Sequence, residues 1–483
     1  MKKSLILGLP ALLLAMSSCV DSLQSDNINP KLATVVPGVT EVSTAERSLA
    51  RTLTSTNVNL GISRLLVQYW TETTYNDESR YNLANRNIPE NFWTPLYTTT
   101  LSNLKDATRT ISADPALDAK IKANQLACID VLAVQTWATL VDTYGNIPYT
   151  DALNVENPQP KYDDAAGIYT DLLKRLDADL AAMVTTSTGL GSADLIYGGN
   201  MTRWVRYANS LKLRLAMNTV DVDPARAKTV AEQAAGKIFQ STADNAQLAF
   251  TSANPNQNPL YEDLVASGRT DFVGAKTLID PLISLNDPRL SIYFQPLDGT
   301  TDYVGAVYGP QGSVNTASQP GTVLRVATLP GVLASYSEMQ FLLAEAAARG
   351  FAVGGTADTY YNNAITASIT YWEGLANKTT AAADAAAYLA QPAVAYATAT
   401  GDYKQKIGTQ KWISLYNQPT QAWVEVRRLD YPRLVKPTNA LTDIPLRFTY
   451  PVSEQNLNGT NYADASTKIG GDKVTTKIFW DKL

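Results

Sequence analysis

The stretch that decides the fold is Leu126-Ala-Cys-Ile-Asp-Val-Leu-Ala-Val-Gln-Thr-Trp-Ala-Thr-Leu-Val-Asp-Thr-Tyr144. It belongs to residues 116–144, which predict one long helix that is apolar almost all round in its middle. A helix of this kind is buried on every face, so other helices must surround it. Gly145 and Pro148 end the pattern. The sequence therefore predicts a helical protein organised around a buried helix.

Amphipathic patterns on both sides of this stretch predict further helices, and Ser335 with Glu338 has the spacing of a capping box. These helices are joined by short breaks, which predicts a mostly α fold of helix-turn-helix repeats with little β-structure. The frequent Gly, Pro, Asn and Asp residues of about 240–330 predict loops, short helices and a hairpin near 303–308. The tail from residue 430 is predicted to be irregular. The expected helices are 45–70, 92–111, 163–183, 204–217, 224–236, 335–350, 357–372, 402–416 and 418–428.

The N-terminus has the pattern of a secretory signal. Two lysines precede the apolar run Leu5–Met16, and two serines precede Cys19. The run is too short to span a bilayer, which needs about 20 apolar residues. Cys19 after small residues resembles a bacterial lipobox, which implies cleavage before Cys19 and acylation of this residue, for example by palmitate. The alternative is an ordinary signal peptide with an incidental Cys.

These features divide the chain into a signal peptide (1–18), a lipidated tether (19–35) and a folded domain (36–483). The tether is polar and has few packing groups, and a flexible segment of this length reaches about 20 Å. The domain is therefore expected to sit close to a membrane through its lipid anchor.

Composition excludes several classes of function. A net charge of −5 argues against a nucleic-acid partner, which requires a basic surface. The chain has no His, which excludes Ser-His-Asp and Cys-His catalysis and His-ligated zinc. No metal cluster or cofactor is expected from the motifs, and whether oxygen-rich loops bind a Ca²⁺ ion stays open. Cys128 is predicted to be a small core residue. A glycosidase that uses two carboxylates remains compatible with the composition.

Aromatic residues are concentrated in residues 69–97, which hold seven among 29, against 9% in the whole chain. Aromatic faces bury the apolar face of a sugar, and Asn, Asp and Arg side chains, here including Arg86, hydrogen-bond its hydroxyls. Phe92, Trp93 and Tyr97 begin a helix and are predicted to pack inside. A second candidate is the loop around Tyr303, Tyr308 and Arg269, which equally fits a contact with a transporter. The predicted ligand-binding residues are Tyr69, Trp70, Tyr75, Asn76, Arg80, Tyr81, Tyr303 and Tyr308.

Four stretches resemble the SusD/RagB family of nutrient-binding outer-membrane lipoproteins. Asp287-Pro-Arg-Leu290, Tyr450-Pro-Val-Ser-Glu454 and Trp480-Asp481 also fit, and the similarity covers nearly the whole mature chain in order. The four stretches are Asp142-Thr-Tyr-Gly-Asn-Ile-Pro-Tyr149, Trp204-Val-Arg-Tyr-Ala-Asn-Ser-Leu-Lys-Leu-Arg-Leu-Ala-Met217, Ser337-Glu-Met-Gln-Phe-Leu-Leu-Ala-Glu-Ala-Ala-Ala-Arg-Gly350, and Lys406-Ile-Gly-Thr-Gln-Lys-Trp412 continued by Trp423-Val-Glu-Val-Arg-Arg428.

The resemblance implies a SusD-like scaffold of four TPR-like helix pairs on the exterior of the outer membrane. There the family acts as a lid over a SusC-like TonB-dependent transporter and helps to capture glycans or, in some members, peptides. Asp21 is the only acid soon after Cys19, so the family's surface-export signal is weakly marked. Within the matching stretches, Glu425, Arg427 and Arg428 suit ion pairs and packing, and Trp412 and Trp423 are expected in the core.

The sequence leaves three candidate functions to be tested. The first is a non-catalytic surface lipoprotein that binds a nutrient oligomer, with a glycan favoured over a peptide, and delivers it to a SusC-like transporter. The second is a secreted all-helical glycosidase that uses two carboxylates. The third is a helical-repeat scaffold that binds only protein.

Overall fold

Helix α7 (Ala119–Tyr144) is the buried centre that the sequence predicts. In the computed structural model, which describes residues 36–482, Asp118 caps this helix by accepting from the Lys120 and Ile121 amides at 2.9 and 3.1 Å. Gly145 follows the last turn at φ 84°. The helix is long and apolar enough to cross a membrane, but most of its apolar stretch is buried inside the protein. It is therefore a core helix of this fold.

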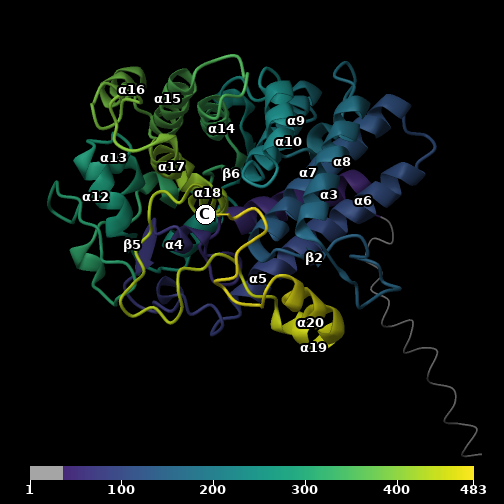
Figure 1. Ribbon diagram of the computed structural model, residues 1–483, viewed down its shortest axis with the longest axis horizontal. Coiled ribbons are helices and arrows are strands. Elements are labelled where there is room, and N and C mark those ends of the chain that lie inside the picture. The colour runs from purple at the N-terminus through teal and green to yellow at the C-terminus, as the bar shows by residue number, and fades with distance from the viewer. Residues whose placement is uncertain (1–35, 483) are drawn as a thin grey trace, which may run out of the picture. The chain divides into compact units, whose positions relative to one another are not determined.

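Helices that follow one another in the chain pack as pairs, and these pairs form the scaffold (Figure 1). This arrangement confirms the mostly α, TPR-like fold that we predicted. Helices α3 (Gly38–Thr54) and α6 (Ser102–Ala113) pack together beside α7. The pairs are α7 with α8 (Ala165–Ala182), α9 (Met201–Asn218) with α10 (Pro224–Ala234), α14 (Tyr336–Ala348) with α15 (Ala357–Leu375), and α17 (Tyr403–Ser414) with α18 (Pro419–Leu429).

One predicted helix is wrong. The segment 45–70 is interrupted: α3 ends at Thr54, residues 55–62 form a loop, and only the short helix α4 (Ser63–Leu66) follows. Side chains explain the break, since the Ser55 hydroxyl accepts from the Asn57 amide and the Asn57 side chain accepts from the Asn59 amide, both at 2.9 Å. Such local bonds compete with the helix. The 92–111 helix starts earlier, as α5 (Ile88–Thr94), and passes through a π-helical turn, η2 (Pro95–Leu101), into α6.

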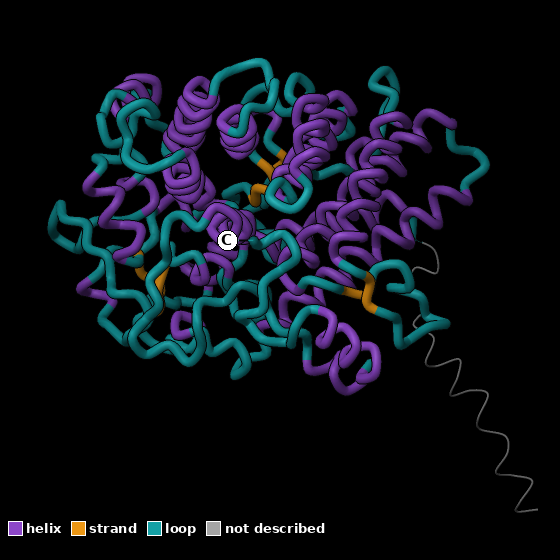
Figure 2. Tube along the Cα trace, in the orientation of Figure 1, coloured by secondary structure: helices purple, strands orange, loops and turns teal. Residues whose placement is uncertain are grey.

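Strands are short, as Figure 2 shows, and within residues 36–482 they form three antiparallel pairs. The pairs are β1 (Trp70–Glu72) with β5 (Phe272–Gly274), β2 (Ile147–Pro148) with β3 (Tyr162–Asp163), and β4 (Ala246–Leu248) with β6 (Gly331–Ala334). The helices of 240–330 are short. They are the 3-10 helices η4 (Thr242–Asp244), η6 (Val314–Thr316) and η7 (Thr322–Arg325), the π-helical turn η5 (Glu262–Ala266), and the α-helices α11 (Pro259–Tyr261), α12 (Lys276–Ser284) and α13 (Leu290–Tyr293).

The hairpin expected near 303–308 is absent from the described residues. Ala306 instead bridges in parallel to Ala275: its amide donates to Gly274 O at 2.9 Å, and its carbonyl accepts from the Lys276 amide at 2.8 Å. The segment therefore pairs with a distant part of the chain rather than with its own neighbour.

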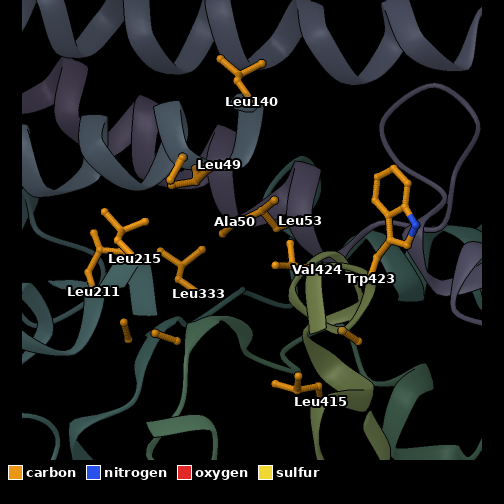
Figure 3. Packing of buried hydrophobic residues seen from close by; sticks show 14 of the residues in the cluster. Leu49, Ala50, Leu53, Leu140, Leu211, Leu215, Leu333, Leu415, Trp423 and Val424 are labelled. Carbon is orange, nitrogen blue, oxygen red and sulfur yellow. The ribbon is translucent and has the colours of Figure 1, made fainter. Parts of the chain in front are cut away.

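The core joins helices from the whole length of the domain (Figure 3). Trp412 and Trp423 are buried in it, and so is Cys128, as predicted. Buried ion pairs run through the same region: Glu425 lies 2.6 Å from both Lys411 and Arg428. Arg427 differs from the expectation, because it donates to the backbone carbonyls of residues 142, 423 and 446 rather than to a carboxylate.

The tail packs over the body, as expected for an irregular segment. It contains α19 (Val452–Leu457) and α20 (Gly459–Lys468). Outside the tail, α16 (Ala381–Leu389) packs on α15. The Trp480 indole donates to Asp142 on α7 at 2.8 Å. The predicted signal peptide (1–18), Cys19 and the tether (19–35) lie outside the described residues.

Candidate functional site

Four of the predicted ligand-binding aromatics are core residues. Tyr69 and Trp70 have no exposed area, and Tyr81 and Tyr308 are also buried. Their polar atoms bind protein groups: the Trp70 indole donates to the Tyr416 hydroxyl at 2.7 Å, and the Tyr308 hydroxyl donates to Leu65 O at 2.9 Å. These rings therefore do not form the ligand platform that we expected, because they pack against residues far away in the chain, such as Trp412, Phe272 and each other.

Two other predicted residues hold loops together, and a third is half-buried. The buried Asn76 side chain donates to Gly309 O at 2.5 Å. The half-buried Arg80 donates through Nε to Asn439 O at 3.1 Å. Tyr303 is half-buried against the core and does not line the groove described next. Tyr75 alone among the predicted residues is well exposed, at 70%.

Tyr75 stands at an open groove of about 560 Å³, a size typical of ligand sites. Three segments form it: the loop after α3, the loop that follows β1, and the turn before β5. The break in the helix predicted at 45–70 thus supplies one wall of the groove. The lining residues are Val58, Thr74, Tyr75, Arg86, Gly268, Arg269, Thr270 and Asp271.

The loop that carries Tyr75 is held in place on both sides. The Thr73 amide donates to Asp271 O at 2.8 Å, and the Gly312 amide donates to Thr73 O at 3.1 Å. Tyr75 itself has φ 53°, a left-handed conformation that costs free energy for an aromatic residue. Hydrogen bonds at the flanking Thr73 and Asn76 hold the backbone here, so the backbone that presents Tyr75 needs little further ordering on binding.

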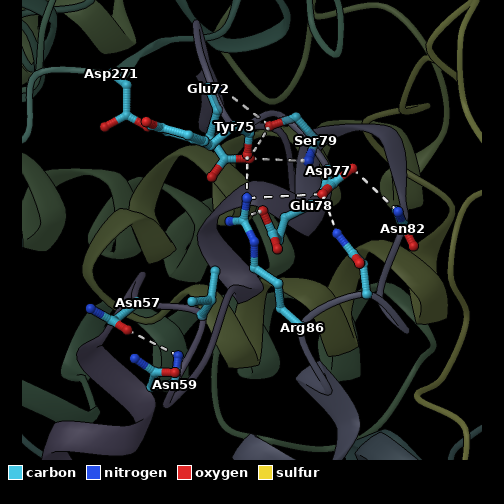
Figure 4. A network of polar contacts seen from close by, with 12 residues as sticks. Asn57, Asn59, Glu72, Tyr75, Asp77, Glu78, Ser79, Asn82, Arg86 and Asp271 are labelled. Carbon is cyan, nitrogen blue, oxygen red and sulfur yellow. Dashed lines mark hydrogen bonds and ion pairs between the residues drawn. The ribbon is translucent and has the colours of Figure 1, made fainter.

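A polar network fixes the next residues of this loop (Figure 4). Arg86 donates to Glu78 at 3.1 Å and lies 3.9 Å from Asp77. The side-chain amides of Asn82 and Asn85 donate to Asp77 at 3.2 and 2.7 Å. One guanidinium thus joins the buried Glu78 to the partly exposed Asp77.

The opposite wall is built around Arg269. Its Nε and Nη2 donate to the two oxygens of Asp271 at 2.9 and 2.7 Å. The guanidinium carbon lies 4.4 Å from the ring centre of Phe272, a cation–π contact. Hydrogen bonding to Asp271 raises the pKa of Arg269, so this side chain stays charged.

Two buried acids lie behind these arginines. Desolvation, followed by the nearby Glu78 charge, raises the pKa of Glu72 to about 8, and desolvation also raises the pKa of Glu78. Neither acid lines the groove, where Asp271 is the one carboxylate among the lining residues. Within residues 36–482 no cluster of three or more acids or cysteines is arranged to hold a metal ion. The groove therefore offers an aromatic face, guanidinium groups and hydroxyl groups for binding.

Sequence reasoning missed most of this lining. Arg86 and Arg269 lie in segments that the sequence points to but are not among the predicted binding residues, while Val58, Gly268, Thr270 and Asp271 carry no local signal of a site. The three segments lie up to about 210 residues apart in the chain, so only folding brings them together.

Comparison with known proteins agrees with this structure. The SusD-like family model, described as starch-binding and associating with the outer membrane, matches residues 30–451. A chitin-binding protein of known structure is similar over 92% of this chain and 100% of its own, with 28% identity and a TM-score of 0.81. No curated protein matches the sequence.

Two further solved structures are similar over 92% of this chain. A chitin-binding SusD homologue from Flavobacterium johnsoniae has 25% identity, a TM-score of 0.77 and 98% of its own chain covered. A SusD homologue from Bacteroides uniformis has 25% identity, a TM-score of 0.77 and 99% covered. Since the family model covers most of the sequence and the helix-pair scaffold is the expected one, this chain belongs to the SusD-like family.

Proposed function

We propose that this protein is a surface lipoprotein that binds an oligosaccharide in the Tyr75 groove and delivers it to a SusC-like TonB-dependent transporter without catalysis. Cys19 carries the lipid that holds it on the outer membrane, facing the cell exterior. The family description, starch-binding and associating with the outer membrane, supports both the ligand class and the location. An oligopeptide is the alternative cargo.

The observation that carries the proposal is Tyr75, a 70% exposed aromatic ring on a fixed loop at the edge of an open groove. A pyranose ring has an apolar face of C–H groups that stacks on such a ring, and its hydroxyls bond to guanidinium and carboxylate groups. Similar solved structures include chitin-binding proteins, so chitin oligomers are the first ligands to test.

Replacing Tyr75 tests the groove directly. We expect the wild type to bind a chitin or starch oligosaccharide with micromolar or weaker affinity, since an open groove leaves much of a sugar hydrated. Tyr75→Ala should weaken that binding about tenfold, because it removes the stacking face. Tyr75→Phe keeps the face and should bind within a few-fold of the wild type. Calorimetry with both oligosaccharides measures these affinities.

Leu457→Ala is the matched control, since Leu457 on α19 is exposed to the same degree, at 71%, and does not line the groove. Equal affinities of Tyr75→Ala and the wild type would contradict the groove. If calorimetry detects no binding of any glycan or peptide, the result would favour a scaffold that binds only protein. Hydrolysis of a bound glycan, lost on changing one Asp or Glu, would favour the glycosidase.

A further inference from the structure

The charges around the Tyr75 groove are already balanced by the protein. Arg86 contacts Glu78 at 3.1 Å and Asp77 at 3.9 Å. Arg269 contacts Asp271 at 2.7 Å and Glu72 at 3.9 Å. Four carboxyl groups therefore face two guanidinium groups. Burial raises the pKa of Glu72 to about 8 and also raises that of Glu78, so the charge balance depends mainly on the two remaining acids, Asp77 beside Arg86 and Asp271 beside Arg269.

The geometry leaves little of either guanidinium for an anionic ligand. Arg269 uses Nε and Nη2 on Asp271, and its side chain is only 26% exposed. The Asp271 side chain is 9% exposed, so a ligand carboxylate would have to displace a nearly buried partner. Breaking such a pair leaves a buried charge without compensation, which is costly. Arg86, 28% exposed, is held in the same way by Glu78, whose side chain is fully buried.

The third segment of the groove adds no free positive charge. The buried Asp263 accepts from the Asn57 side-chain amide at 2.7 Å, and Arg51 is paired with Glu262 at 2.7 Å. The two arginines that line the groove are therefore each matched by an acid, whereas Arg80, farther along the same loop, donates to Asn439 O. Like charges brought together in such a site reduce affinity, and salt screens this repulsion.

We propose that the groove selects uncharged oligosaccharides and rejects those that carry uronate or sulfate groups, because its two arginines are neutralised by carboxylates of the same chain. This inference rests on the proposed function and specifies its class of ligand. Asp271 is the residue that sets the selection on one wall, since it occupies the two donors of Arg269 that face it.

The test compares oligosaccharides that differ only in charge. The probes are a chitin hexamer and a maltohexaose, each with its counterpart oxidised at C6 from a hydroxymethyl group to a carboxylate. At low salt we expect the neutral form to bind about tenfold tighter than its carboxylate counterpart, with the ratio shrinking as salt rises. The readout is the ratio of the two affinities, measured by calorimetry.

Asp271→Asn keeps the shape of the side chain and removes its charge, while the Asp271 carbonyl still accepts from Thr73. In this variant we expect the ratio of neutral to carboxylate affinity to fall at least about threefold, because the charge of Arg269 is no longer neutralised by Asp271. Asp464→Asn is the matched control: it changes the net charge equally on α20, outside the groove, and should keep the wild-type ratio. Thermal unfolding of each variant shows that it is folded.

Three results would overturn the inference in distinguishable ways. If the wild type binds the carboxylate form as tightly as the neutral one, charge selection is wrong while glycan binding stands. If Asp271→Asn keeps the wild-type ratio, Asp271 is not the selecting residue. If neither neutral hexamer binds and no other glycan does, the proposed function itself fails and this inference fails with it.

Discussion

Glu72 shows how burial and charge oppose each other at a single residue behind the groove. Its side chain is fully buried, and it accepts from the Ser79 hydroxyl at 3.1 Å and the Ser79 amide at 3.3 Å. These bonds and the distant Arg269 favour the charged form, but desolvation and Glu78 outweigh them and raise the pKa to about 8. The protein therefore holds a protonated carboxyl beneath a charged rim.

This raised pKa predicts a loss of stability at alkaline pH. A carboxyl whose folded pKa lies above its unfolded value of 4.5 contributes its full stability below pH 4.5, and that contribution is lost as pH rises through about 8. The side chain in Glu72→Gln cannot ionise. From pH 5 to pH 9 the unfolding free energy of this variant should therefore fall by about 2 to 4 kcal/mol less than that of the wild type. Urea unfolding at pH 5, 7 and 9 measures the difference. The exposed Glu156, changed to Gln, is the control, and parallel curves for Glu72→Gln and wild type would contradict the prediction.

At the scale of elements, the groove depends on loops that are fastened to one another rather than on a helix. Gly305 lies so close to the start of α12 that a Cβ there would stand 2.4 Å from Lys276 Cα. This approach lets Ala306 bridge to the end of β5, and the same segment continues to Gly309 and Gly312, which bond to the Tyr75 loop. A contact at α12 thus supports the loop that presents Tyr75.

Gly305→Ala should therefore disturb both stability and binding. We expect a loss of about 1 to 3 kcal/mol of unfolding free energy, because the added methyl group meets backbone atoms that cannot move aside. Ligand affinity at the groove should fall as well. Gly374→Ala on α15 is the control: a Cβ there meets nothing within 4 Å, and Ala favours a helix by up to about 1 kcal/mol. Equal unfolding free energies for the two variants would show that the close approach is not needed.

At the scale of the molecule, residues from both ends of the domain meet on the same helices. Arg64 donates to Tyr416 O at 2.5 Å, and Arg427 and Trp480 both bond to Asp142 on α7 at 2.8 Å. Such contacts join segments that lie far apart in the chain, as the three segments of the groove do. They make the domain one body that a single lipid anchor could position.

The proposed lipid anchor on Cys19 leads to a prediction about the whole molecule. Cys19→Ala removes the thiol that would be acylated, so we expect the protein to leave the membrane fraction, whereas Leu457→Ala stays in it. Mass spectrometry of the wild type extracted in mild detergent should show acyl chains on Cys19, and a TonB-dependent barrel should co-purify. A membrane-bound Cys19→Ala protein together with a wild type free of acyl chains would refute the anchor.

The local sequence pattern was sufficient to predict most of the helices. The apolar run at Leu126–Val134 predicts α7, and the capping spacing of Ser335 and Glu338 predicts the start of α14, where the Ser335 hydroxyl accepts from the Glu338 amide at 3.3 Å. Helical periodicity is a property of neighbouring residues, so one sequence reveals it. The break at residues 55–62 escaped this approach, because Leu49, Leu53 and Leu60 keep an apolar spacing across it.

By itself, the sequence determined the helical class, the order of the helix pairs and the motifs that mark a SusD-like protein, because these depend on residues close together in the chain. Only the tertiary structure decided which aromatic side chain reaches solvent. Tyr69, Tyr75 and Tyr81 stand in similar local sequence, yet two are buried and one is 70% exposed. The physical reason is that burial is set by partners such as Trp412 and Tyr308, which lie hundreds of residues away and meet these rings only when the chain folds.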